Sequence, residues 1–147
     1  MHRVVINFGQ VRQVGRTTAM LAIFESIIEN INVRNLKHIS RIMYVVRNED
    51  CAVQLSNKIK YEVRNIGTNT KIFKGMVNNT TFSIVSTNAL QLSHTPIEPP
   101  NCKCPNCGYN LNRKKAVVFL DGTVNRESDI RKHFPDSEWD LDLYLAD

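Results

Sequence analysis

A short polar segment near the N-terminus, Arg12–Thr18 (RQVGRTT), has residue types and spacing that suit phosphate binding. It follows the apolar run Val4–Gly9 and precedes a strongly apolar stretch, which predicts the order strand, tight turn, helix. Backbone N–H groups at a helix start have no intrahelical acceptor and lie at the positive end of the helix dipole, so they favour an anion. The alternative interpretation is a simple turn between core elements, capped by Thr17 and Thr18.

A cysteine cluster gives the second chemical signal, with three of the chain's four cysteines within six positions. Its Cys104–Gly108 part (CPNCG) is typical of a tight turn in which two thiolates converge on one metal ion, as in one knuckle of a zinc ribbon. The predicted ligands of this structural zinc site are His94, Cys102, Cys104 and Cys107. His133 or Cys51 could serve in place of His94, and the alternative is a set of unbound surface thiols.

The elements that must position these residues follow an α/β pattern. Apolar runs and helical spacing predict strands over 3–8, 41–47, 71–74, 81–86 and 116–121, and helices over 17–31, 49–66 and 127–132. Asn48 is the expected N-cap of the second helix and Gly67 its C-terminal stop. The alternation in Trp139–Leu145 predicts a half-buried strand at a sheet edge. We therefore expect a mostly parallel sheet with helices on both faces.

The chain of 147 residues fits a single domain, 1–147, with a proline-rich, zinc-binding excursion at 93–112. Its apolar fraction of 42% and charged fraction of 22% are ordinary for a globular protein. No apolar stretch has the length of a membrane span, and no secretory leader opens the sequence. These features predict a cytoplasmic protein without membrane association.

The net charge of +5 is unevenly distributed along the chain. Residues 1–75 contain 12 Lys/Arg and 5 Asp/Glu, residues 76–115 contain 4 and 1, and residues 116–147 contain 3 and 8. The net charges of these segments are therefore +7, +3 and −5. A basic body suits a polyanion such as nucleic acid, and the Arg113–Lys115 run could contact its phosphate backbone. The alternative is an ordinary solvated basic surface.

The Arg12–Thr18 segment and the apolar helix after it resemble the Walker A region of P-loop ATPases of the phage terminase large-subunit and helicase-like type. The resemblance covers about the first half of the chain and implies a RecA-like core. The nucleotide-binding residues that it implies are Arg12, Gln13, Gly15, Arg16, Thr17, Thr18 and Asp121. In this scheme the Arg16 and Thr17 N–H groups contact phosphate, the Thr17 hydroxyl reaches Mg²⁺, and Asp121 acts as the Walker B aspartate.

Three departures from the family pattern bear on activity. Arg16 stands where the family has lysine, and Gly122 stands where active members have the glutamate that orients the attacking water. The expected first glycine falls at Gln10, one position after Gly9. The resemblance thus implies a degenerate ATPase of viral origin, in the host cytoplasm, that binds Mg-ATP or nucleic acid with weak or absent hydrolysis. The alternative is a non-enzymatic interaction or inhibitor protein on the same scaffold, acting on a protein partner or as a homo-oligomer.

Overall fold

The computed structural model describes residues 2–6, 13–30, 39–77, 80–92 and 114–146. Its strands are β1 (His2–Ile6), β2 (Ile39–Val46), β3 (Arg64–Asn65), β4 (Ile72–Val77), β5 (Thr80–Ser86), β6 (Lys114–Asp121) and β7 (Trp139–Ala146). Its helices are α1 (Gln13–Asn30), α2 (Glu49–Lys58), α3 (Thr87–Leu92) and α4 (Glu127–His133), with a 3₁₀ turn at Val124–Arg126. In this part of the chain the strands form one seven-stranded sheet in the order β1-β7-β6-β2-β5-β4-β3.

The sheet has a parallel part and an antiparallel end. The strands β1, β7, β6, β2 and β5 are mutually parallel, whereas β4 is antiparallel to β5 and β3 to β4. The expectation of a mostly parallel α/β sheet is therefore confirmed. The predicted strand at 71–74 exists as β4, but it extends the sheet through a hairpin with β5, because only residues 78–79 separate the two strands.

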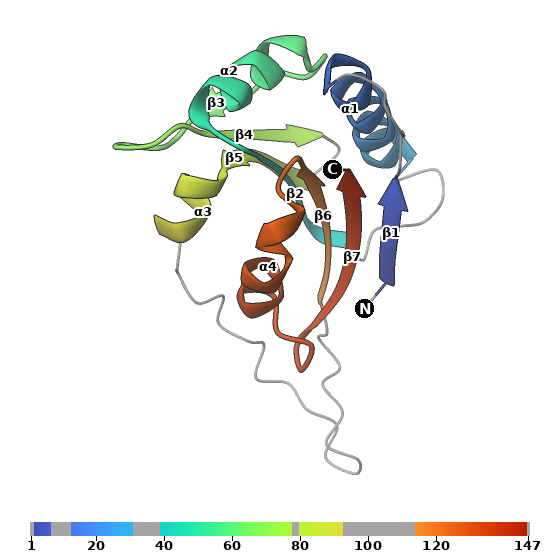
Figure 1. The fold of residues 1–147 in the computed structure, drawn as a ribbon. Coiled ribbons are helices and arrows are strands. Elements are labelled where there is room, and N and C mark those ends of the chain that lie inside the picture. The colour runs from blue at the N-terminus through green and yellow to red at the C-terminus, as the bar shows by residue number, and fades with distance from the viewer. Residues whose placement is uncertain (1, 7–12, 31–38, 78–79, 93–113, 147) are drawn as a thin grey trace.

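Helices cover both faces of the sheet, as Figure 1 shows, with α1 and α2 on one face and α3 and α4 on the other. The two central strands β2 and β6 have apolar side chains on both faces, which is why their sequences are continuous apolar runs. Residues at alternate positions along each strand enter separate cores. Tyr44 and Phe119 pack with α1 and α2, whereas Val45 and Leu120 belong to the core beneath α3 and α4.

The second helix begins as predicted and ends earlier. Asn48 is its N-cap, with the side-chain Oδ1 accepting a hydrogen bond from the Cys51 N–H at 2.9 Å. The expected continuation to Ile66 and stop at Gly67 is wrong, because α2 ends at Lys58 and Ile59 has an extended backbone. Ile59 remains buried there, so its apolar spacing reflects core packing in a non-helical segment and not further helix.

The last strand does not lie at the edge of the sheet, so that expectation is wrong. In the described residues β1 pairs with β7 alone and so lies at the edge, whereas β7 lies between β1 and β6. The alternation in β7 arises because its two faces differ. Trp139 and Leu141 are buried against α4. Asp140 and Asp142 lie on the opposite face, where α1 packs over β6 and β2. A strand with two neighbours can thus still have one partly solvated face.

The remaining points concern the last helix, Trp139, the excursion at 93–112 and membrane-spanning helices. The helix predicted at 127–132 is present as α4, and Trp139 is a buried core residue, as expected. The excursion at 93–112, with the predicted ligands His94, Cys102, Cys104 and Cys107, lies outside the described residues. Among the residues that are described, no helix is both long and apolar enough to cross a membrane.

Candidate functional site

The carboxyl ends of the parallel strands meet at one edge of the sheet, and three of them end at the same level. Ile6 at the end of β1 is in register with Ala146 of β7, and so is Asp121 at the end of β6. Two inter-strand spacings, about 10 Å, therefore separate the end of β1 from Asp121. The chain that leaves β1 toward α1 begins level with this carboxylate.

The same edge contains a topological switch point between β2 and β6. From β2 the chain continues through α2 toward β5, whereas from β6 it continues through α4 in the opposite direction to β7. Adjacent strands whose connections diverge in this way leave a crevice outside their carboxyl ends, where open α/β sheets bind ligands. The residues that follow these two strands are Arg47 and Asn48 after β2, and Gly122 and Thr123 after β6.

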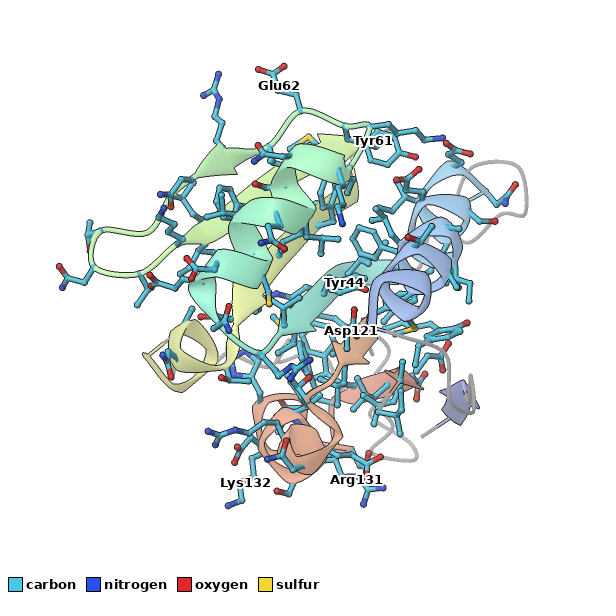
Figure 2. The ribbon with its side chains drawn as sticks, turned by 45° about the horizontal axis from the view of Figure 1, so that its top comes forward. Tyr44, Tyr61, Glu62, Asp121, Arg131 and Lys132 are labelled. Atoms are coloured by element: carbon cyan, nitrogen blue, oxygen red, sulfur yellow. The ribbon has the colours of Figure 1, made fainter. Side chains whose placement is uncertain are left out.

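Asp121 is the buried charged side chain at this edge, with only 6% of its surface exposed. The Tyr44 hydroxyl on the neighbouring strand donates a hydrogen bond to Asp121 Oδ2 at 2.9 Å. Figure 2 shows the two side chains beside one another next to α1. Asp121 lies two positions after Phe119 on β6, so both side chains lie on the same face of the sheet. Because Phe119 packs against α1, the Asp121 carboxylate lies on the face that α1 covers. The hydroxyl fixes the orientation of the carboxylate.

The turn after Asp121 is held by hydrogen bonds to both neighbouring strands. The Gly122 N–H donates to the Ala146 carbonyl at 2.7 Å, and the Thr123 hydroxyl donates to the Val45 carbonyl at 3.4 Å. Gly122 has φ 68°, a left-handed conformation that glycine adopts without a steric penalty and that other residues disfavour. The position where the family resemblance expects a glutamate is therefore a position that the backbone reserves for glycine.

The helix after β1 begins earlier than the sequence predicts. α1 starts at Gln13, four residues before the expected Thr17, so Gly15 and Arg16 lie in its first turn. The N–H groups without an intrahelical acceptor belong to this first turn, which moves the expected donors toward the Gln13 end. Arg12 and the side chains of residues 13–17 lie outside the described part, and Thr18 is exposed. Their roles in phosphate binding stay a prediction.

An aromatic cluster joins α1 to the strands that carry Asp121 and Tyr44. The Phe24 ring of α1 meets the rings of Tyr44 and Phe119 edge-on, with centroids 5.4 Å apart in each case. The Phe119 ring is stacked between Tyr44 at 5.8 Å and Tyr144 at 4.6 Å. Such pairs stabilise a packed core beyond the burial of their area. The cluster therefore fixes the height of α1 above the strands that end at the candidate site.

Tyr44 is the residue of this site that sequence analysis missed. Its hydroxyl is the one polar group among the side chains of Ile42–Val46, a segment that otherwise reads as an apolar strand. A buried phenol needs a hydrogen-bond partner, and Asp121 provides it from a position 77 residues away. The polar atom in an apolar run was the available signal, but the sequence alone does not name its partner.

The alternative zinc ligands, Cys51 and His133, pack on opposite faces of the sheet. Cys51 lies in the first turn of α2 and packs against the core beneath α1 and α2, whereas His133 ends α4 on the other face, with its ring 4.9 Å from that of Phe134. The described residues contain no group of three or more potential metal ligands. The ligand set with His94 stays a prediction.

Comparison with known protein families, with curated proteins and with solved structures gave no match to this chain. The candidate site is therefore argued from its own geometry.

Proposed function

We propose that this chain binds a nucleoside triphosphate with Mg²⁺ at the carboxyl edge of its sheet, on a P-loop ATPase-like scaffold, with weak or absent hydrolysis. The observation that carries the proposal is the common register of Ile6 and Asp121 with Ala146. It brings the end of β1, from which the chain continues to α1, level with a buried carboxylate on the face that α1 covers. N–H groups that donate hydrogen bonds to phosphate and a carboxylate that binds the metal ion are the two parts that such a site needs.

Asp121 is suited to Mg²⁺ because this ion is bound in proteins by one or two carboxylates, by water and by substrate phosphates. Its carboxylate is oriented by Tyr44 before any ligand arrives. When bound, Mg²⁺ would neutralise phosphate charge. The first turn of α1 would supply N–H donors, and Arg12 and Arg16 would pair with phosphate oxygens, following the family resemblance.

Gly122 supports the absence of efficient hydrolysis. Active relatives in the family that the sequence resembles use a glutamate next to the Walker B aspartate, and the left-handed backbone here disfavours any residue with a Cβ. The proposal is thus a nucleotide-binding protein in which binding is separated from turnover.

Calorimetric titration of the full chain with Mg-ATP tests the proposal. We expect saturable binding that Asp121→Asn, Arg16→Ala and Arg12→Ala each weaken. Asp142→Asn is the matched control, since Asp142 also projects toward the α1 side but pairs with Lys115 at 3.1 Å, away from the carboxyl edge. Absence of binding at millimolar Mg-ATP would contradict the proposal and leave the non-enzymatic interaction protein as the remaining candidate.

A zinc measurement on the same preparation tests the predicted excursion separately. We propose one structural zinc ion held by His94, Cys102, Cys104 and Cys107, because tetrahedral sites of Cys and His are the usual structural zinc sites. Elemental analysis of the purified protein, with Cys104→Ser for comparison, gives the result directly. A zinc content equal in the two proteins would contradict the assignment.

A further inference from the structure

Two basic residues lie on adjacent strands at the amino edge of the sheet, opposite the edge with Asp121. Arg41 of β2 is in register with Ala116 of β6, and Lys114 lies two positions before Ala116. The two strands are parallel, and their register shifts between Ile39 and Arg41. Both side chains lie on the face that α4 covers, as their ring contacts show.

Aromatic rings support both cations without neutralising them. Arg41 Cζ lies 5.9 Å from the centroid of the Phe134 ring, and Lys114 Nζ lies 5.7 Å from that of Trp139. The two rings contact one another edge-on, with centroids 4.9 Å apart. The guanidinium and the ammonium group thus lie against one contacting pair of rings, with both charges retained.

Arg41 is a half-buried cation without a carboxylate partner within 4.0 Å among the residues of the described ranges. Burial lowers the pKa of its guanidinium from the ordinary value, and the group remains protonated at neutral pH. A partly desolvated charge without a counter-ion is costly for the fold alone. An external anion at this position would offset that cost.

The structure also separates the basic run that the sequence analysis identified. Lys115 projects to the opposite face and forms an ion pair with Asp142 at 3.1 Å. Lys114, in contrast, faces Trp139 and no carboxylate of the described residues lies within ion-pair distance of its ammonium group. Of these two adjacent lysines, Lys114 is therefore the one whose ammonium group has no carboxylate partner among the described residues.

The surroundings of the Arg41–Lys114 pair are basic on one side and acidic on the other. The last turn of α4 contains the exposed residues Arg131 and Lys132, which Figure 2 shows pointing outward. The turn between α4 and β7 contains Asp136 and Glu138 and limits the basic area there. In the sequence, residues 30–48 and 99–120, which include both strands' amino ends, contain no Asp or Glu.

We infer that Arg41 and Lys114 form a contact site for the phosphates of a nucleic-acid backbone. Arg and Lys contacts to phosphate position a nucleic acid without reading its sequence. The buried rings of Phe134 and Trp139 leave no surface for base stacking, so the contact is independent of sequence. This site lies at the opposite edge of the sheet from the proposed nucleotide site.

Fluorescence anisotropy with a labelled DNA duplex and its single strand, over a series of salt concentrations, tests this inference. We expect the double variant R41Q/K114Q to bind on the order of tenfold more weakly at low salt, with a salt slope shallower by about 2. The matched control is R64Q/K74Q, which removes an exposed Arg–Lys pair directly opposite one another on β3 and β4. It should retain at least most of the affinity and slope.

Equal losses in the two double variants, or no binding by the wild-type chain, would overturn the inference. Saturable binding of inorganic phosphate by Arg41 and Lys114 without any binding of DNA would assign the site to a free anion and would overturn it too. Because Arg41 is half-buried, K114Q is measured alone as well, and thermal unfolding checks that each variant folds. The assay contains no free nucleotide or Mg²⁺, so failure here is distinguishable from failure of the nucleotide proposal.

Discussion

The two faces of the sheet are built from different kinds of side chain. The face beneath α1 and α2 contains the rings of Phe24, Tyr44, Phe82 and Phe119 and, at its carboxyl edge, the buried Asp121. The face beneath α3 and α4 is mainly aliphatic, with Phe134 and Trp139 near its amino edge. The first face holds its polar group inside the core through a hydrogen bond, whereas the second keeps its charges at the rim on aromatic rings.

This difference suits the two proposed sites to different ligands. A buried, oriented carboxylate beside a helix start suits a metal ion and a phosphate group in a fixed position. Cations at an open rim suit a flexible polyanion whose phosphates need only charge.

Replacing Phe24 should have the largest effect, since its ring joins α1 to both central strands. We expect Phe24→Ala to lower the free energy of unfolding by about 3–5 kcal/mol, measured by urea denaturation. Ile130→Ala on the α4 face is the comparison, with an expected loss of about 2–5 kcal/mol. A mild variant, Phe24→Leu, should also weaken Mg-ATP binding, and Ile130→Val should not. Equal effects of the mild variants on binding would contradict a special role for the aromatic face.

Removing the Tyr44 hydroxyl should destabilise the protein through Asp121. Tyr44→Phe takes away a donor to a buried carboxylate, so we expect a loss of about 1–3 kcal/mol in the free energy of unfolding. In a double-mutant cycle with Asp121→Asn the two losses should not add, because the residues share one hydrogen bond. Additive losses would show that the hydrogen bond contributes nothing to stability.

Substituting Gly122 should be costly because of its backbone conformation. Gly122→Ala places a Cβ on a residue with φ 68° and should lower the free energy of unfolding by about 1–2 kcal/mol. Gly122→Asn should cost less, since asparagine tolerates the left-handed region better. Gly122→Glu should not produce an ATPase, despite restoring the family residue. Appearance of ATP turnover in that variant would contradict the proposed role of Gly122.

The smallest effect concerns alkaline pH and Tyr144. Burial raises the pKa of Tyr144 above its ordinary value of 10.0, Asp142 raises it further, and Lys115 lowers it. A folded-state pKa above the unfolded one stabilises the protein at neutral pH, and this contribution is lost as pH rises from about 10 through the folded pKa. The free energy of unfolding should therefore fall in that range, and Tyr144→Phe should reduce the fall. An identical pH profile in the variant would contradict this assignment.

Local sequence signals predicted the elements better than their order. The apolar runs of β2 and β6 and the Asn48 cap depend on nearby residues, and the structure contains all three. The predicted end of the second helix was wrong because Ile59 and Val63 continue an apolar spacing that serves the core outside any helix. Helical periodicity reports burial, and burial does not require a helix.

For this protein the sequence by itself determined an α/β fold, the strand that ends in Asp121, and the helix that follows the first strand. Each of these rests on short-range pattern and on the continuous apolar character of strands with two covered faces. Tertiary pairing was needed to establish that β1 lies at the edge beside β7, that Tyr44 orients Asp121, and that Arg41 and Lys114 lie on adjacent strands. The physical reason is that strand order and register depend on pairings between residues far apart in the chain, which local pattern does not specify.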